Sequence, residues 1–433
     1  MATNSKNKVP EFSIEQEQNE FAASTEREKI KGSKNLNVPP LRFPEFTDEW
    51  TKSTIGDCFE LYSGNTPSRL DKKNFSGEIN WITSGELKEH YIGETKEHIS
   101  EEVVKENNLK LIPVGTFVIA IYGLEAEGVR GTGSITMQKS TISQACMAFT
   151  PTSMITNEFL YSWYKKHGNA IGIKYAQGTK QQNLCYEIIE KFKIQYPSLK
   201  EQEKLNHFIS LLDERIATQS RIIDKLQSLI KGIIQRLVHD GLEKETWHKV
   251  MLSEILSERN ELNIEYYPVH SVSVSVGIVN QVEYLGRSFA AKDTAHYNVV
   301  KYGDIVYTKS PTGNQPFGII RQSQCQNSVA VSPLYGVYKP DSFEIGNILH
   351  YYFLNPLNTN NYLFPLIQKG AKNTINITNR RFLENSIPLP ISNDEILSVS
   401  KALSSLNTKI VLENNTLYTL LKQKRYLLNM LFI

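Results

Sequence analysis

Cysteine is scarce in this sequence of 433 residues, which contains only four. None belongs to a Cys-x-x-Cys pair, and the four are Cys58, Cys146, Cys185 and Cys325. Such dispersion argues against a zinc or dithiol redox motif, so we expect reduced thiols that fill the core. The nine histidines form no His-Glu-x-x-His pattern either. We therefore expect no structural or catalytic metal in this chain.

Long hydrophobic runs and a strong net charge are also missing. The longest apolar stretch, residues 116–122, has the length of a buried strand and not that of a membrane span. No apolar segment follows the polar residues 1–8, so we expect a cytoplasmic protein without a secretory signal. Lys and Arg number 48 against 46 Asp and Glu, a formal charge of +2. A nucleic-acid-binding surface would therefore have to come from local clustering of basic residues.

The sequence does contain a two-fold internal repeat. The segment Trp50-x-Lys52-x-x-Ile55-Gly56-Asp57 aligns with Trp247-x-Lys249-x-x-Leu252-Ser253-Glu254. Further along, Gly115-Thr116-Phe117-Val118 aligns with Gly303-Asp304-Ile305-Val306. The offset between the halves drifts from motif to motif, which indicates insertions and deletions in loops. We expect two halves with one architecture.

Short apolar and β-branched runs, broken by Gly, Pro, Asn and Ser, dominate each half over residues 41–197 and 241–390. This pattern predicts a mixed α/β or mainly β unit in each half. The predicted strands are residues 79–83, 117–122, 269–276, 304–308 and 329–338. Residues 1–40 are polar and predict a flexible or weakly helical tail.

Each half ends in a helical seam, with apolar positions spaced alternately by four and three residues. The first seam, within residues 198–240, is Leu212, Ile216, Gln219, Ile223, Leu226, Ile230, Ile233 and Leu237. The second, within residues 391–433, is Leu406, Ile410, Glu413, Leu417, Leu420, Lys424, Leu427 and Leu431. A lone helix would leave its seam in water, so we expect the two helices to form an antiparallel coiled coil about 60 Å long.

Two alternatives to this pairing are a long helical hairpin packed into a core and a homodimeric coiled coil. The intramolecular pair is favoured because the seams match position by position, each shifted by 194 residues. The polar seam residues Gln219, Glu413 and Lys424 would fix the register at some cost in stability.

Several short motifs accompany the repeat. In the first half they are Leu41-Arg42-Phe43-Pro44-Glu45-Phe46 before Trp50, Ser63-Gly64-Asn65-Thr66-Pro67-Ser68 before Ile79-Asn80-Trp81-Ile82-Thr83, and Pro197-Ser198-Leu199-Lys200-Glu201-Gln202-Glu203-Lys204 before Phe208. In the second half Ile387-Pro388-Leu389-Pro390 keeps the proline motif. Over about residues 41–433 the chain thus resembles the specificity subunit of type I restriction-modification enzymes. The second helix begins Asp394-Glu395-Ile396 in place of Glu201-Gln202, and Asn407 replaces Asp213, so we expect the contacts at the helix entrance to carry over less well.

The resemblance implies an α+β fold with two target recognition domains, residues 41–197 and 241–390, and two conserved spacer helices, residues 198–240 and 391–433. Each domain would recognise one half of a bipartite, asymmetric target in double-stranded DNA, and the paired helices would set the spacing between half-sites by geometry. The resemblance also implies that this chain has no catalytic centre and no cofactor of its own. Two modification subunits would bind S-adenosylmethionine and methylate adenine, and restriction subunits that use ATP and Mg²⁺ would join them.

Base recognition in the major groove needs Arg, Lys, Asn, Gln, Ser or Thr side chains on loops. Candidates in the first unit are Ser63, Asn65, Thr66, Ser68, Arg69, Arg130, Lys180, Gln181 and Gln182. Candidates in the second unit are Lys309, Ser310, Asn314, Gln315, Lys372 and Asn373. The alternative is that these loops are ordinary turns. Arg380-Arg381 fits either a phosphate contact or a solvated helix end.

Catalytic motifs are incomplete. Asp71 with Glu86-Leu87-Lys88 matches a short nuclease pattern that charged surfaces often produce. Asn355-Pro356-Leu357-Asn358 lacks the second proline and the aromatic residue of adenine methyltransferases, and residues 123–128 have Walker spacing but are followed by Val129 instead of Lys. We therefore expect no enzyme. A scaffold with duplicated protein-binding units on a coiled coil remains the alternative to a DNA-recognition subunit.

Overall fold

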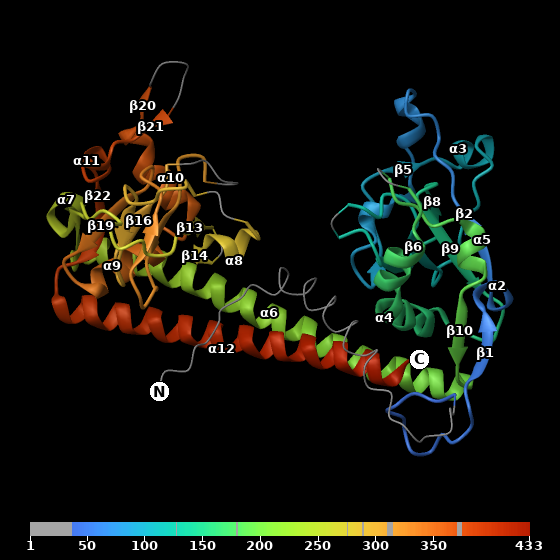
Figure 1. Cartoon of the computed structure of the whole chain (residues 1–433). Coiled ribbons are helices and arrows are strands. Elements are labelled where there is room, and N and C mark those ends of the chain that lie inside the picture. Colours follow the sequence, from blue (N-terminus) through green and yellow to red (C-terminus); the bar gives the residue numbers. More distant parts are fainter. Residues whose placement is uncertain are drawn as a thin grey trace. The chain divides into compact units, whose positions relative to one another are not determined.

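The computed structural model describes residues 37–126, 128–178, 181–274, 276–287, 290–309, 315–369 and 375–433 (Figure 1). The chain divides into two compact units. The N-terminal unit comprises residues 30–218 and 419–433, and the C-terminal unit includes residues 219–418. Most of the predicted tail, residues 1–36, lies outside the described residues.

The N-terminal unit contains three sheets and several helices. Its strands are β1 (Thr51–Thr54), β2 (Phe59–Ser63), β3 (Ile79–Ile82), β4 (Tyr91–Ile92), β5 (His98–Ile99), β6 (Phe117–Ala120), β7 (Gly133–Thr136), β8 (Ser140–Ile142), β9 (Cys146–Pro151) and β10 (Lys193–Tyr196). Its helical segments are α2 (Ile55–Cys58), η1 (Lys72–Phe75), η2 (Ser84–Glu86), α3 (Glu101–Glu106), α4 (Asn157–Tyr175), α5 (Tyr186–Glu190) and parts of two long helices described below. The sheets have the orders β2-β9-β6-β7-β4, β5-β3-β8 and β1-β10.

The core of this unit lies between the five-stranded sheet and α4. Strand β6 is buried at all four positions, as its continuous apolar sequence requires of a central strand. The ring of Phe117 on β6 packs edge-on against two rings of α4. The distance between ring centroids is 6.0 Å to Tyr161 and 5.7 Å to Tyr164. Thr156 caps the N-terminus of α4, and its side chain accepts a hydrogen bond from the Phe159 amide.

The C-terminal unit repeats this plan with shorter strands. The strands are β11 (Trp247–Met251), β12 (Leu256–Glu258), β13 (His270–Ser273), β14 (Gly277–Asn280), β15 (Asn298–Val300), β16 (Ile305–Tyr307), β17 (Ile320–Gln322), β18 (Val329–Val331), β19 (Gly336–Pro340), β20 (Gln368–Lys369), β21 (Ile375–Asn376) and β22 (Ser386–Pro390). The helical segments are α7 (Leu252–Ile255), α8 (Gln281–Leu285), α9 (Phe343–Tyr352), α10 (Pro356–Leu363), η3 (Phe364–Leu366) and α11 (Asn379–Phe382).

The internal repeat is visible in the strand order. The sheet β12-β19-β16-β17 has the same sequence of neighbours as β2-β9-β6-β7, and all of these neighbours are antiparallel. In each unit a separate antiparallel pair, β1-β10 or β11-β22, precedes a long helix. The predicted α+β class and the two-fold repeat are confirmed.

Two strand predictions were too long. The strand predicted over residues 269–276 ends at Ser273 as β13, which pairs in a hairpin with β14, and β14 begins at Gly277 with a φ of 86°. Residues 329–338 form β18 and β19, separated by a turn in which the Tyr335 amide bonds to the Ser332 carbonyl around Pro333. Both segments are rich in β-branched and apolar residues, and the local signals of a break are Gly277 after the first and Ser332-Pro333 within the second.

The two long helices are α6 (Leu199–Glu243) and α12 (Asn393–Leu431). Within the C-terminal unit they lie side by side and antiparallel (Figure 1): the Gln219 side chain donates to Glu413, and the Ile391 amide bonds to the Thr246 carbonyl. The seam residues of this unit are buried or half-buried in its core, namely Ile223, Leu226, Ile230, Ile233, Leu237, Leu406, Ile410 and Leu417. Gln219 and Glu413 occupy the shared polar level, joined by a 2.6 Å bond between Nε2 and Oε2.

In the N-terminal unit the other ends of the same helices meet. Leu212, Ile216 and Leu427 are half-buried, and Leu420 and Leu431 are buried. The ammonium group of Lys424 forms an ion pair with Asp213, a residue outside the predicted seam. Lys166 of α4 donates to the carbonyl oxygens of Asn429 and Phe432 at the end of α12, a helix terminus whose carbonyls lack intrahelical partners.

In each unit a buried tryptophan bonds to a glutamate near the start of a long helix. The Trp50 indole donates to Glu201 of α6 at 3.3 Å, and the Trp247 indole donates to Glu395 of α12 at 2.7 Å. Gln202, by contrast, bonds to Thr156, Met154 and Pro197, whereas its counterpart Ile396 has no polar side chain. The expectation that these contacts carry over poorly is therefore wrong for the indole bond and confirmed for Gln202.

The cysteines are free thiols. Cys58 and Cys146 are buried, whereas Cys185 and Cys325 are only half-buried. The prediction that all four fill the core is therefore wrong for two of them. Burial raises the pKa of the Cys146 thiol to about 12, so this residue is inert at neutral pH.

Candidate nucleic-acid interface

The first candidate loop connects β2 to β3 in the N-terminal unit. Ser63, Asn65, Ser68 and Arg69 are exposed, and Thr66 is half-buried. The loop runs close to the neighbouring sheet: a Cβ atom on Gly64 would lie 1.9 Å from the Ile142 carbonyl oxygen, so only glycine fits there. Four of the five predicted residues are thus accessible on a closely packed loop.

Arg69 is held within the protein. Its two terminal nitrogens each bond to one carboxylate oxygen of Glu97 at 2.9 Å. The guanidinium also lies over the rings of Phe75, at 4.9 Å, and Trp81, at 5.2 Å. The bond from Arg69 lowers the pKa of the Glu97 carboxyl, so the pair stays ionised at neutral pH. In this conformation the guanidinium of Arg69 is paired with Glu97, and its contact with DNA stays a prediction.

A second candidate region joins two segments that are distant in sequence. Arg130 donates to the Gln182 side chain at 2.7 Å, and the Gln182 amide donates to Glu125 at 2.7 Å. The Leu124 amide bonds to the Gln182 carbonyl, so the loop that contains Gly123, Gly128, Gly131 and Gly133 lies against the segment around Gln182. Gln181 is exposed beside them, and Lys180 lies outside the described residues. Gln181 is thus the described candidate whose side chain is most accessible here.

The candidates in the C-terminal unit are mostly outside the described residues, namely Ser310, Asn314, Lys372 and Asn373. Lys309 is half-buried, and burial lowers the pKa of its ammonium group. Gln315 is only 1% exposed, and its contact with bases stays a prediction. Its side chain would have to leave the interior to reach DNA.

The two neighbouring arginines behave differently. Arg381 donates to the Leu366 carbonyl at 2.8 Å and lies 3.5 Å from Glu384, so it holds α11 against the preceding segment. The side chain of Arg380 is 94% exposed. Arg380 also lies 3.9 Å from Glu384, but it is the more exposed of the pair and therefore the better placed for a phosphate contact.

The incomplete catalytic motifs have structural roles. Asp71 accepts a hydrogen bond from the Lys73 amide and caps η1. Both carboxylate oxygens of Glu86 accept bonds, one from Thr83 and the other from the Lys96 amide. Asn355 caps α10 by accepting from the Leu357 amide. These side chains are occupied by local backbone groups, which explains the motifs without catalysis.

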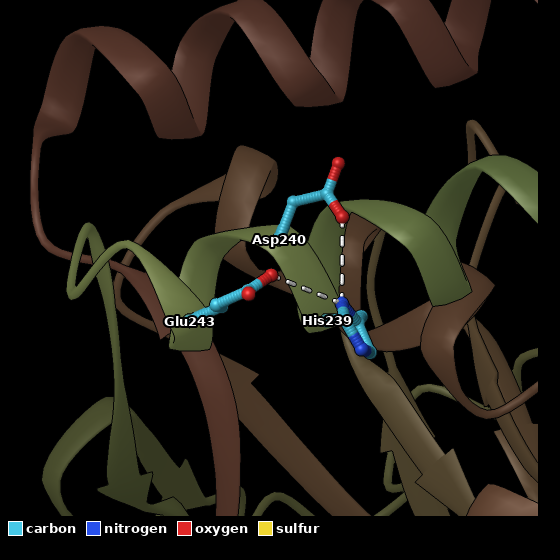
Figure 2. A group of neighbouring side chains, drawn as sticks. All are labelled: His239, Asp240 and Glu243. Carbon is cyan, nitrogen blue, oxygen red and sulfur yellow. Dashed lines mark ion pairs between the residues drawn. The ribbon is translucent and has the colours of Figure 1, made fainter.

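One group of potential metal ligands lies near the end of α6. His239 Nδ1 is 3.4 Å from Asp240 and 3.8 Å from Glu243, and Figure 2 shows the two carboxylates flanking the imidazole. Asp240 also pairs with Arg236 one turn earlier. His239 and Glu243 are largely exposed. Such spacing is typical of ion pairs on a solvated helix, and we assign no ligand to it.

Sequence reasoning missed the residues that follow Arg69. Leu70 is 98% exposed, and Lys72 and Lys73 are exposed beside it. The available signal was one apolar residue within a polar, charged loop.

None of the described helices combines the length and the hydropathy needed to span a bilayer.

The strand order defines a duplicated α+β fold, and the candidate contact residues lie on its loops. Residues 47–228 match the family model of the type I restriction modification DNA specificity domain. Over that segment, which is less than half of the chain, the match agrees with the resemblance seen in the sequence.

Characterised relatives agree with this match. The chain is 25% identical over 276 residues to the MjaIX specificity subunit of Methanocaldococcus jannaschii. The aligned stretch covers 59% of this chain and 62% of the relative. It is 26% identical over 177 residues to the EcoR124I/EcoR124II specificity subunit of Escherichia coli, which covers 40% of this chain and 43% of the relative. The matched stretch thus spans less than two thirds of either relative.

Two solved structures share the fold. The S subunit of a type I restriction-modification system from M. genitalium superposes with a TM-score of 0.53 at 16% identity, covering 92% of this chain and 99% of that one. A chain from a type I restriction-modification system studied for complex assembly and conformational transition gives 0.50 at 15% identity, covering 90% and 98%. The likeness extends over both units and so supports the repeated α+β fold.

Proposed function

We propose that this chain is the DNA-recognition subunit of a type I restriction-modification complex. Each unit recognises one half of a bipartite, asymmetric target in double-stranded DNA. The observation that carries the proposal is the duplicated sheet order β2-β9-β6-β7 and β12-β19-β16-β17 in a chain whose residues 47–228 match a DNA specificity domain. A duplicated fold with divergent loops is suited to two different half-sites, because the framework is kept while the contacts differ.

The catalytic steps belong to partner subunits in this proposal. Two modification subunits bind S-adenosylmethionine and methylate adenine, and restriction subunits use ATP and Mg²⁺ to cleave DNA. The paired helices α6 and α12 dock these partners and set the spacing between half-sites. We assign residues 41–197 and 241–390 to the two recognition domains, in keeping with strand pairs β1-β10 and β11-β22 that close each one.

The small net charge of +2 shapes the expected binding behaviour. Affinity for duplex DNA comes largely from cations that contact phosphates. Arg69 and Arg130, two of the candidate cations, already bond to Glu97 and Gln182. We therefore expect the chain alone to bind DNA weakly, with strong binding only after partners add basic surface.

A DNA-binding assay tests this proposal against the scaffold alternative. The chain is co-expressed with its modification subunits, and the methylated motif is mapped in host DNA. The assembled complex is expected to bind a duplex with that motif at least about a thousandfold more tightly than a scrambled duplex, with affinity falling steeply as salt rises. Host DNA without a split methylated motif, or binding that ignores both sequence and salt, would favour the scaffold.

A further inference from the structure

The tip of the β2-β3 connection presents one apolar side chain to solvent. Leu70 is 98% exposed, the highest value among the large exposed hydrophobic residues of the described chain. Its neighbours on the tip are polar: Ser68 and Arg69 precede it, and Asp71 follows it. A leucine in this position gains nothing from the core, so its contribution has to come from something that contacts the tip.

Hydrogen bonds and ring contacts fix the conformation of the tip. Arg69 is fixed by two bonds to Glu97 and by the rings of Phe75 and Trp81 directly before Leu70. On the other side Asp71 caps η1. The Asn74 side chain then donates to the Ser68 carbonyl at 2.9 Å, which closes the loop beneath Leu70. Preorganisation of this kind lowers the entropy lost when the tip binds a partner.

Charge around the tip identifies the kind of partner. Lys72 and Lys73 are exposed next to Leu70, while Asp71 is committed to the η1 backbone and Glu97 is neutralised by Arg69. A protein interface of about 800 Å² per partner needs an apolar centre, which one leucine among charged residues does not provide. One apolar side chain flanked by cations matches the wedge that DNA-bending proteins insert between base steps.

We propose that Leu70 is a DNA wedge: it inserts between two base pairs of the half-site bound by the N-terminal unit, and Lys72 and Lys73 contact the flanking phosphates. This inference rests on the proposed function. Arg69 is then a positioning residue that orients the tip and does not contact bases. Recognition at this point depends on how easily the base step unstacks, so flexible pyrimidine–purine steps are favoured there.

The test uses the complex assembled with its modification subunits and duplexes carrying the mapped target. Successive bases of the half-site are replaced with 2-aminopurine, whose fluorescence rises when it is unstacked. The wild-type complex is expected to raise the fluorescence at one step. L70A is expected to abolish this rise and to weaken binding about tenfold, and L70M is expected to restore both. K72A and K73A should each lower the salt slope by about one while keeping the fluorescence rise.

Leu334→Ala is the matched control, since Leu334 is also exposed, at 67%, but lies in the turn between β18 and β19 of the other unit. The L334A variant is expected to change neither the 2-aminopurine fluorescence nor the affinity for DNA. Unchanged fluorescence and affinity in L70A, with the target still bound, would overturn the wedge and leave the proposed function intact. Loss of a modification subunit from the L70A complex would also overturn it and make Leu70 a protein contact. A wild-type complex without sequence-specific binding would instead refute the proposed function.

Discussion

Replacing Glu201 with alanine is expected to lower the free energy of unfolding of the N-terminal unit by about 3 kcal/mol. The Glu201 side chain is 1% exposed and accepts two 2.7 Å bonds from Arg42, whose own side chain is 13% exposed. It also accepts the Trp50 indole bond. Removing the carboxylate leaves a largely buried guanidinium and a buried indole N–H without partners, and both retain their desolvation cost. The estimate is at the lower end of the range for broken buried ion pairs because Arg42 keeps some access to water.

The internal repeat supplies the matched control, Glu395→Ala. Glu395 is half-buried and accepts the Trp247 indole bond, but no arginine pairs with it among the ion pairs of the described residues. Its removal is expected to cost about 1–2 kcal/mol in the C-terminal unit. Urea unfolding followed by tryptophan fluorescence distinguishes the units, because Trp50, Trp81 and Trp163 lie in one and Trp247 in the other. Equal losses in the two variants would show that the Arg42 pair contributes nothing beyond the indole bond.

The parts of the fold that the sequence predicted are those with a local or repeated signal. The heptad-like spacing predicted both long helices and the polar level shared by Gln219 and Glu413, since periodicity is a property of the sequence itself. The partner of Lys424 was not predicted. Asp213 follows the seam residue Leu212 directly, and only the packing of the helices brings it to Lys424.

The candidate interface was harder to predict because loop side chains form contacts with residues that are far away in sequence. Arg69 has the residue type and the loop position of a base contact. It forms an ion pair, however, with Glu97, which lies 28 residues further along the chain. The same holds for Arg130, whose partner Gln182 is 52 residues away. Gln315 is a polar residue in a predicted loop, yet its side chain is buried. Residue type predicts which side chains are able to contact bases, and tertiary contacts decide which are free to do so.

Exchange of one recognition domain is expected to change one half of the methylated motif completely and to leave the other half unchanged. The replaced segment is residues 41–197, taken from a relative with a different target. The physical reason is that each unit has its own core: the N-terminal cluster includes Phe117, Phe149 and Phe159, and the C-terminal cluster includes Tyr307, Tyr338 and Phe382. Loops carried by one core are therefore free to differ without disturbing those carried by the other. Methylation mapping of host DNA reports the result for both half-sites at once.

The contacts that cross the graft boundary decide whether the chimera folds. Arg42 and Trp50 bond to Glu201, and Trp163 and Lys166 bond to the carbonyls of the two residues that follow α12. The donor segment must therefore supply the same residue types at these positions. The reciprocal exchange of residues 241–390, which must keep the Trp247 bond to Glu395, is expected to change only the other half. A change in both halves after a single exchange would show that recognition is shared between the units. An unchanged motif in a folded chimera would place the base contacts outside residues 41–197, and both outcomes would refute one recognition domain per half-site.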